Sequence, residues 1–138
     1  MKIELLPFQK HGDERGMLVA LEQIKNVPFE IKRVYYMFGT KDNVRRGFHA
    51  HKELRQLAIA VRGSCYFHLD DGVDKVEVLL NDPAQGLLIE PAVWHEMYNY
   101  SDDCILLVLA SDVYDESDYI RSYDTFQESL KNEPTQAE

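Results

Sequence analysis

The chain has 138 residues, of which 45% are hydrophobic, and its formal net charge at pH 7 is −9. This length suits one domain with a core of its own, and the negative charge argues against nucleic acid as a partner. No apolar run approaches the length of a membrane span, and the first residues do not resemble a signal peptide. We therefore expect a cytoplasmic protein without a membrane partner, in which Cys65 and Cys104 are reduced and buried.

The first third of the chain predicts short strands separated by turns. Residues 2–8 form an expected edge strand that ends near Pro7. A Gly-rich turn over residues 12–16 leads into a strand over residues 17–21. Residues 31–38 are rich in β-branched and aromatic side chains, and their alternation places one set on a single face of the strand, namely Arg33, Tyr35 and Met37.

The rest of the chain continues this pattern until about residue 112. Strands are expected over residues 54–62, 64–69, 74–80, 87–89, 94–98 and 105–110, with a hairpin turn at Asp70-Asp71-Gly72. Apolar residues at roughly helical intervals then predict a helix over residues 118–131, broken near Asp124. These elements indicate an all-β sandwich or small barrel with a short C-terminal helix. Residues 1–131 would form the single domain, and residues 132–138 a polar tail.

Two histidines stand out in the segment Arg46-Gly47-Phe48-His49-Ala50-His51-Lys52. Side chains two apart in a strand point to the same face, so His49 and His51 would project together. A metal site and an acid/base pair both use that arrangement. Two exposed histidines on an edge strand are the alternative that spacing alone favours.

Charge is distributed unevenly around this segment. Residues 1–62 hold 12 Lys/Arg and 7 Asp/Glu, whereas residues 63–138 hold 3 and 17. If the clustering is not chance, the basic groups beside the histidines favour a small anionic ligand. The acidic run Asp112, Asp115, Glu116 and Asp118 is interpreted as a solubilising segment that begins the helix.

The spacing of several of these residues resembles the two sequence motifs of cupins. Gly47, His49-x-His51, Gln56 and Gly63 follow the first motif, and Gly86, Pro91, His95 and Asn99 follow the second. The resemblance implies a cupin jelly-roll barrel. Gln56 occupies the position of the metal-binding glutamate, with the cation Arg55 beside it, so we expect no metal. Metal binding through His49, His51 and His95 alone remains an alternative.

Metal-free imidazoles in a barrel beside arginines suit proton transfer, because imidazole takes and returns a proton near neutral pH. A carbon acid next to a ketone is a natural substrate for such a base. Arg15, Arg33 and Arg46 could each hold a phosphate group through a forked contact. Tyr35 could stack on a base or bond to a sugar.

Five blocks taken together are similar to the successive motifs of the cupin-type sugar 3,4-ketoisomerases. They are Asp13-x-Arg15-Gly16, Arg33-Val34-Tyr35-Tyr36, Arg46 to Lys52, Pro91-Ala92-Val93-Trp94-His95-Glu96 and Asp118-Tyr119-Ile120-Arg121. The resemblance covers essentially residues 3–130. It implies a metal-free homodimer, without a cofactor, that acts on dTDP-4-keto-6-deoxyglucose and supplies a 3-keto sugar for amination and use in cell-surface glycans.

The resemblance also implies roles for individual residues. His49 and His51 would be the acid/base pair that works through an enediol, with His51 as the preferred first base. Tyr35 and Arg46 would lie by the sugar or the pyrophosphate. Arg15 and His95 would lie at the sugar end, a combination that favours the galacto over the gluco product.

Two other functions fit the same fold. A dTDP-sugar 3,5-epimerase pairs a histidine base with an aspartate and a tyrosine proton donor, whereas here two histidines take that place. A non-catalytic cupin that binds a sugar nucleotide is the other. For the dimer, the N-terminal edge strand and the first turn are the segments expected to pair with a second subunit.

Overall fold

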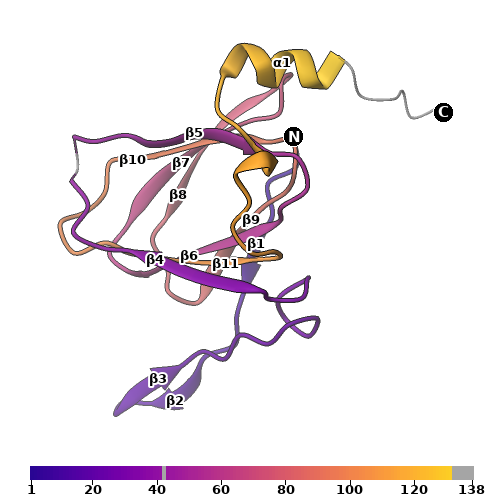
Figure 1. Cartoon of the computed structure of the whole chain (residues 1–138). Helices are drawn as coiled ribbons and strands as arrows, with labels where there is room; N and C mark the ends of the chain where they lie inside the picture. The colour runs from indigo at the N-terminus through magenta and orange to yellow at the C-terminus, as the bar shows by residue number, and fades with distance from the viewer. Residues whose placement is uncertain (42, 132–138) are drawn as a thin grey trace.

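The computed structural model describes residues 1–41 and 43–131, and it shows two antiparallel five-stranded sheets packed face to face (Figure 1). The first sheet has the order β1 (Leu5–Pro7), β9 (Gln85–Ile89), β6 (Gln56–Arg62), β11 (Ile105–Ala110) and β4 (Arg33–Met37). The second has the order β12 (Tyr119–Ile120), β5 (Arg46–His51), β10 (Trp94–Tyr98), β7 (Cys65–Asp70) and β8 (Lys75–Leu80). The predicted cupin-type β fold is confirmed.

Apolar residues that alternate along the strands fill the space between the sheets. The main core contains Cys65, Phe67, Leu80, Leu87 and Leu106, each of which is at most 2% exposed. The hairpin predicted at residues 70–72 joins β7 to β8 in register, with Asp70 opposite Lys75. Strand alternation therefore accounts for both the core and the inward direction of the side chains described below.

One hairpin stands away from both sheets. Strands β2 (His11–Asp13) and β3 (Gly16–Leu18) pair only with each other among the described residues, and every residue in them is exposed. Figure 1 shows this hairpin, which we call the arm, projecting from the side of the barrel where β4 lies. The strand expected over residues 17–21 is thus shorter, and it does not join the barrel.

The C-terminal region differs from the helix predicted over residues 118–131. A short 3₁₀ helix, η1 (Glu116–Asp118), is followed by strand β12, which pairs with β5, and only then by helix α1 (Tyr123–Lys131). The prediction was wrong for the first turn because Ile120 is buried by pairing with Ala50, a long-range contact that helical spacing cannot reveal. The tail predicted over residues 132–138 lies outside the described residues.

Helix α1 covers the outer face of the second sheet, on the side opposite the first (Figure 1). Its residue Phe126 is fully buried against Trp94, with ring centroids 5.8 Å apart. Within residues 1–41 and 43–131, none of the helices has the length and apolar character that a membrane crossing requires.

Candidate active site

A bulge in β5 aims the two histidines of this strand into the barrel. Gly47 and Phe48 both adopt positive φ, 95° and 61°, and the pairing of β5 with β10 shifts by one residue at this point. A side chain at Gly47 would place its Cβ 2.8 Å from the carbonyl oxygen of His95, so only glycine fits. Phe48 is the extra residue of the bulge, and its side chain points outward. His49 and His51 then face inward, as the strand alternation predicts.

A third histidine joins them from the neighbouring strand. His95 on β10 is the cross-strand partner of His49, and their ring centroids are 4.6 Å apart. The rings of His49 and His51 are 5.1 Å apart, and those of His51 and His95 are 5.8 Å apart. One nitrogen from each of the three rings lies within 4.8 Å of the other two. The histidines named by the sequence motifs therefore form a single cluster.

Hydrogen bonds fix the tautomer of each ring. The Nδ1 atoms of His49 and His95 lie 3.1 Å from the carbonyl oxygens of Gly47 and Val93, respectively. His51 Nδ1 lies 3.1 Å from a carboxylate oxygen of Asp118. Because these oxygens only accept, each Nδ1 must donate, and each Nε2 carries the lone pair. The three basic nitrogens are thus the atoms left to face the shared space.

Burial keeps these imidazoles neutral. It lowers the pKa of His49 to about 4, with His51 adding to the effect, and it lowers the pKa of His95 to about 3. It also lowers the pKa of His51, although the Asp118 carboxylate opposes that shift. At neutral pH all three rings are therefore available as bases or acceptors.

The cluster opens into a pocket of about 310 Å³ between the two sheets. Tyr35 reaches it from β4, and its hydroxyl accepts a 2.6 Å hydrogen bond from Gln56 Nε2. Burial raises the Tyr35 pKa to about 12, so the phenol keeps its proton and can donate it to a bound oxygen. The other lining residues include Arg33, Met37, Arg46, Met97, Tyr114, Tyr119 and Arg121.

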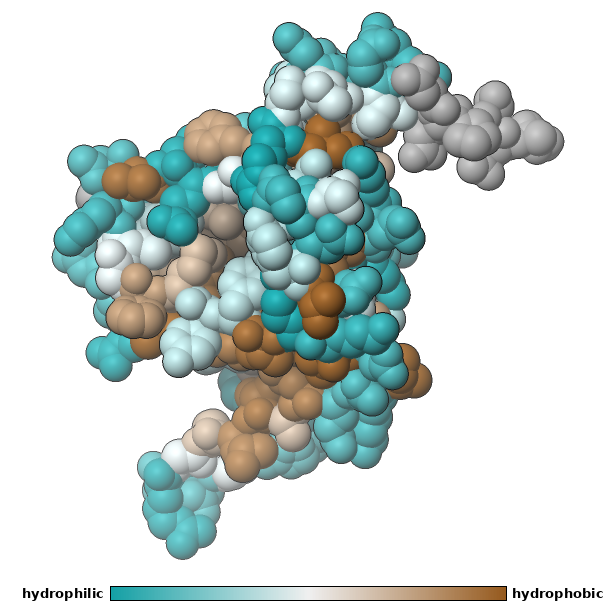
Figure 2. Space-filling model, viewed as in Figure 1, coloured by the Kyte–Doolittle hydropathy of each residue, from teal (hydrophilic) through white to brown (hydrophobic). Residues whose placement is uncertain are grey.

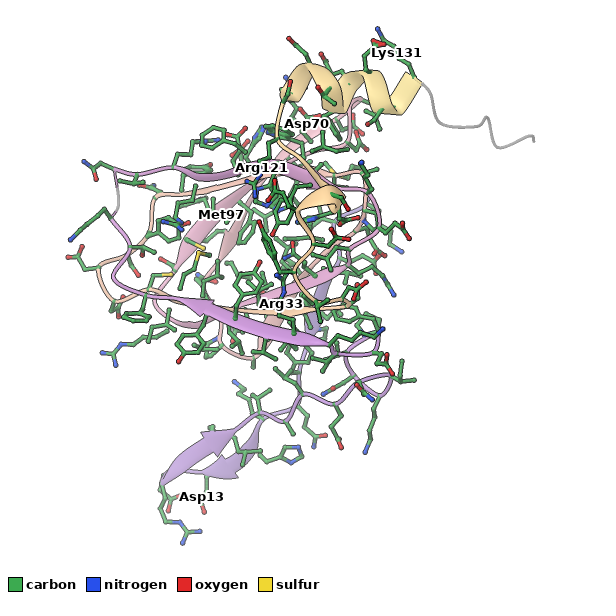
Figure 3. All side chains as sticks on the ribbon, in the orientation of Figure 1. Asp13, Arg33, Asp70, Met97, Arg121 and Lys131 are labelled. Carbon is green, nitrogen blue, oxygen red and sulfur yellow. The ribbon has the colours of Figure 1, made fainter. Side chains whose placement is uncertain are left out.

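Arginines from three segments surround the pocket. The guanidinium of Arg33 lies 5.2 Å from the Tyr35 ring centre, and its buried Nε has no hydrogen-bond partner among the described residues. Arg46 is the first residue of β5 and is exposed. Arg121 stacks 4.3 Å from the Tyr119 ring centre and is held by Glu116 at 2.8 Å. Figure 3 labels Arg33, Met97 and Arg121 around the barrel opening.

Arg15 does not reach this pocket. Its side chain is 86% exposed on the arm and pairs with Asp13 at 2.7 Å. Figure 3 shows Asp13 at the far tip of the arm, well away from Arg33 and Arg121. Of the seven residues that the sequence predicted for the site, the structure brings six together within one chain and leaves this one outside.

The surroundings of Arg55 and of the three histidines differ from the sequence-based expectation about a metal. Arg55 does not face the cluster: it pairs with Glu90 at 2.7 Å and bonds the carbonyl oxygen of Pro28, so it would not repel a cation there. A divalent metal would fit the three Nε2 atoms, since each Nδ1 already has the outer partner that metal-binding histidines use. The neutral Gln56 amide still replaces the carboxylate that cupin metal sites add.

Sequence reasoning missed the residues after η1. The predicted helix hid Tyr119, whose ring lies 4.3 Å from that of His51, and Asp118, which was interpreted as a solubilising charge. This aspartate also removes the contrast with 3,5-epimerases, because His51 does have a carboxylate partner. The alternation of Tyr119 and Arg121 inward with Ile120 outward was the available signal for a strand.

Comparison with known proteins agrees with this geometry. A family model described as WxcM-like, C-terminal (FdtA) matches residues 1–131. The chain is 55% identical over 130 residues to a TDP-4-oxo-6-deoxy-alpha-D-glucose-3,4-oxoisomerase of Aneurinibacillus thermoaerophilus, covering 94% of each chain. A 3'-monoepimerase from Streptomyces bikiniensis, at 15% identity and a TM-score of 0.72, shares the fold alone.

Two crystal structures of relatives superpose closely. A 3,4-ketoisomerase from Helicobacter canadensis has 48% identity and a TM-score of 0.92 over 96% of this chain and 99% of its own. A variant of the ketoisomerase QdtA from Thermoanaerobacterium thermosaccharolyticum, with a histidine replaced by asparagine, was solved with TDP-4-keto-6-deoxyglucose. It has 40% identity and a TM-score of 0.92 over 99% and 97%. This chain therefore belongs to the WxcM-like, C-terminal (FdtA) family of sugar 3,4-ketoisomerases.

Proposed function

We propose that the protein converts dTDP-4-keto-6-deoxy-D-glucose into a dTDP-3-keto-6-deoxyhexose by proton transfer. The observation that carries this proposal is the cluster of three neutral imidazoles, with one nitrogen of each within 4.8 Å of the others, two of which, His49 and His95, line the pocket. The hydrogen atoms move between carbons as protons and the sugar loses no electrons, so the reaction itself requires no redox cofactor. Incubation with the 4-keto sugar should give the 3-keto product by NMR, and an unchanged sugar would refute the proposal.

The residues of the cluster supply the steps in order. A base, His51 or His49, takes the proton from C3, and the C–H electron pair forms the C3–C4 double bond of an enediolate. The charge that develops on O4 is stabilised by a donor, for which the neutral Tyr35 hydroxyl is suited. A protonated imidazole then gives a proton to C4, and the O3 hydroxyl proton passes to O4, which leaves the ketone at C3 and a hydroxyl at C4.

Substrate binding would use the arginines around the pocket. We assign Arg33 and Arg46 to the pyrophosphate or the sugar oxygens, because both line the pocket and the Nε of Arg33 lacks a partner among the described residues. His95 lies opposite His49 on the neighbouring strand and would contact the sugar. Arg33→Ala should raise the Kd for TDP, and an unchanged Kd would remove it from the binding site.

In a homodimer, Arg15 of one subunit could reach the pocket of the other. The outward face of β4 exposes Val34, Tyr36 and Phe38, with 53%, 63% and 71% of each residue accessible. Figure 2 shows hydrophobic surface along this edge of the barrel and down the connection to the arm. A second subunit packed on this face would cover it. The exposed arm of one subunit could then deliver Arg15 to the pocket of the other.

Mixing two inactive variants tests this arrangement. If Arg15 acts across the interface, Arg15→Ala in one subunit and His49→Asn in the other damage the same pocket of a mixed dimer. Co-refolded mixtures should then recover activity, because one pocket per mixed dimer would be intact. If Arg15 acts within its own chain or has no role, mixing restores nothing beyond the separate activities.

The galacto product is the stereochemistry we propose at C4. The support is the resemblance of the Arg15 and His95 combination to galacto-type members. The coupling constant between H4 and H5 of the product decides, since it is small for the axial and large for the equatorial hydroxyl at C4. A large coupling would reverse the assignment.

Three alternatives have distinct outcomes. A 3,5-epimerase would place deuterium at C5 in deuterated water, whereas the ketoisomerase places it at C4 of a 3-keto product. A non-catalytic sugar-nucleotide-binding protein would bind TDP without turnover. A metal-dependent cupin would purify with a stoichiometric metal that His49→Ala removes.

The reaction would provide the ketone that amination at C3 requires. We therefore place the protein in the cytoplasmic synthesis of a deoxyamino sugar for a cell-surface glycan such as an O-antigen, lipopolysaccharide or S-layer glycan. A lower amount of the 3-amino sugar in a strain that lacks this protein would support this assignment.

A further inference from the structure

Gln56 reaches a tyrosine of the pocket across an intervening strand. It is the first residue of β6 and lies opposite Ala110 of β11, the strand between β6 and β4 in the sheet. Its Nε2 donates a 2.6 Å hydrogen bond to the hydroxyl of Tyr35 on β4. Gln56 is only 2% exposed, and both partners line the pocket. The fold therefore places a buried amide against a hydroxyl group of the pocket.

The direction of this hydrogen bond limits where the phenolic hydrogen can point. The amide nitrogen of Gln56 carries hydrogens and does not accept, so the Tyr35 oxygen is the acceptor. The hydrogen of the hydroxyl must then point away from Gln56. Because Tyr35 lines the pocket, an oxygen of a bound sugar can accept that hydrogen. The bond to Gln56 thus leaves Tyr35 as a donor toward the substrate.

Gln56 also affects the acidity of the phenol. Burial and the neighbouring Tyr119 raise the pKa of Tyr35, which reaches about 12, whereas Arg33 and the bond from Gln56 lower this pKa. The amide has this effect because an N–H group that donates to the phenolic oxygen favours the phenolate. In a chain of hydrogen bonds from the amide through the phenol to the substrate, each bond polarises the next. Gln56 therefore makes Tyr35 a stronger donor as well as an oriented one.

We propose that Gln56 is a positioning residue that turns the Tyr35 hydroxyl hydrogen toward the substrate oxygen on which negative charge develops. The inference rests on the proposed function and goes beyond it by naming the group that orients the donor. It also gives a reason for an amide at this position. A carboxylate at residue 56 could only accept, so it would draw the Tyr35 hydrogen out of the pocket. The glutamine that replaces the cupin glutamate thus sets the direction of the Tyr35 hydroxyl.

Gln56→Met is the test because methionine has nearly the same size and forms no comparable hydrogen bond. Without the amide donor, the hydroxyl of Tyr35 is free to rotate, and its hydrogen no longer favours the pocket. If Gln56 instead accepted from Tyr35 through its oxygen, the substitution would release the hydroxyl hydrogen to the substrate and kcat would not fall. Gln85→Met is the matched control, since Gln85 also begins a strand of the same sheet, β9, but does not line the pocket.

We expect kcat of Gln56→Met to fall about tenfold, with the Kd for TDP within about threefold of the unmodified enzyme. Gln85→Met should change neither quantity. Tyr35→Phe should lower kcat about 100-fold, and adding Gln56→Met to it should lower kcat no further, because Gln56 acts through the hydroxyl that is already gone. An unchanged kcat in Gln56→Met, or two losses that multiply in the double variant, would overturn the proposal.

An NMR measurement on the unmodified protein covers the case in which Gln56→Met fails to fold. Nuclear Overhauser contacts should connect the side-chain NH₂ hydrogens of Gln56 with the Tyr35 ring hydrogens beside the hydroxyl. Their absence would mean that the amide oxygen faces Tyr35, and would refute the role of Gln56 whatever the variant does. The outcome is separable from the proposed function: an enzyme that makes the 3-keto product with this amide reversed retains its function and loses only this inference.

Discussion

The two faces of the β5–β10 pair are both buried, yet they bury opposite kinds of side chain. The outer face carries Ala50 and Trp94, at 0% and 4% exposed, under Phe126 of α1. The inner face carries His51 and His95, each 2% exposed, beside the half-buried His49. One sheet thus separates an apolar cluster under α1 from a polar pocket inside the barrel.

This difference shows how the barrel tolerates buried basic groups. Close-packed apolar contacts on the outer face fix the strands at little cost, since they leave no polar atom unpaired. On the inner face each imidazole has one bonded nitrogen and one open nitrogen, and an unpaired buried acceptor lowers stability. We infer that the outer face supplies stability and that the inner face gives some of it up for chemistry.

The largest expected effect comes from the inner face. His49→Asn should lower kcat by about 10³-fold, because a general acid or base is removed from the pocket. The free energy of unfolding should stay within about 1 kcal/mol at pH 7. Steady-state kinetics and urea unfolding measure the two quantities.

His68→Asn is the control for this substitution, since His68 lies on β7, does not line the pocket and pairs with Glu77. It should keep full activity. A His49→Asn protein as unstable as a core variant would contradict the division between the faces.

Substitution on the outer face should do the reverse. Phe126→Ala removes a fully buried ring, and the loss of unfolding free energy should be about 3 kcal/mol. Helix α1 has only 9 residues and depends on such packing. Well below the melting temperature, kcat per folded molecule should be nearly unchanged. Gln127→Ala, on the exposed side of the same helix, should change neither quantity; a tenfold fall in kcat for Phe126→Ala would show that the faces are coupled.

Strand alternation made much of the inner face predictable. The period of two along β4 placed Arg33 and Tyr35 together, and along β5 it placed His49 with His51. His95 required the cupin motif, because its approach to His49 is a cross-strand contact. These predictions succeeded where a local pattern or a known motif encoded the geometry.

The remainder of the site depends on contacts between distant segments. Tyr119, Tyr123 and Phe126 are spaced as in a helix, yet two residues of this segment pair with β5 and turn Asp118 toward His51. The outward course of the arm, and with it the place of Arg15, follows from packing that no local pattern records. Sequence alone therefore could not supply the carboxylate partner or separate Arg15 from the pocket.

A substitution at the bulge should affect both faces to a smaller extent. Gly47→Ala adds a Cβ at positive φ and against the His95 carbonyl oxygen, so we expect a loss of about 2 kcal/mol in unfolding free energy. Activity should fall about tenfold as His49 moves relative to His95. Gly39→Ala is the control, because Gly39 also has a positive φ, 65°, but its Cβ would meet nothing within 4 Å. Equal effects from the two variants would mean that the contact with His95 is unimportant.

The smallest effect is a pH dependence that belongs to the inner face alone. The pKa of His49 is about 4 in the folded protein, below the value near 6.5 of an unfolded chain. Below pH 6.5 the unfolded chain therefore binds a proton that the folded protein does not, so acid favours unfolding in this window. Between pH 6 and pH 5 the unfolding free energy of the unmodified protein should fall by about 1 kcal/mol more than that of His49→Asn. Parallel curves for the two proteins would show that this imidazole is not held neutral by burial, and would remove the reason for treating it as a base at neutral pH.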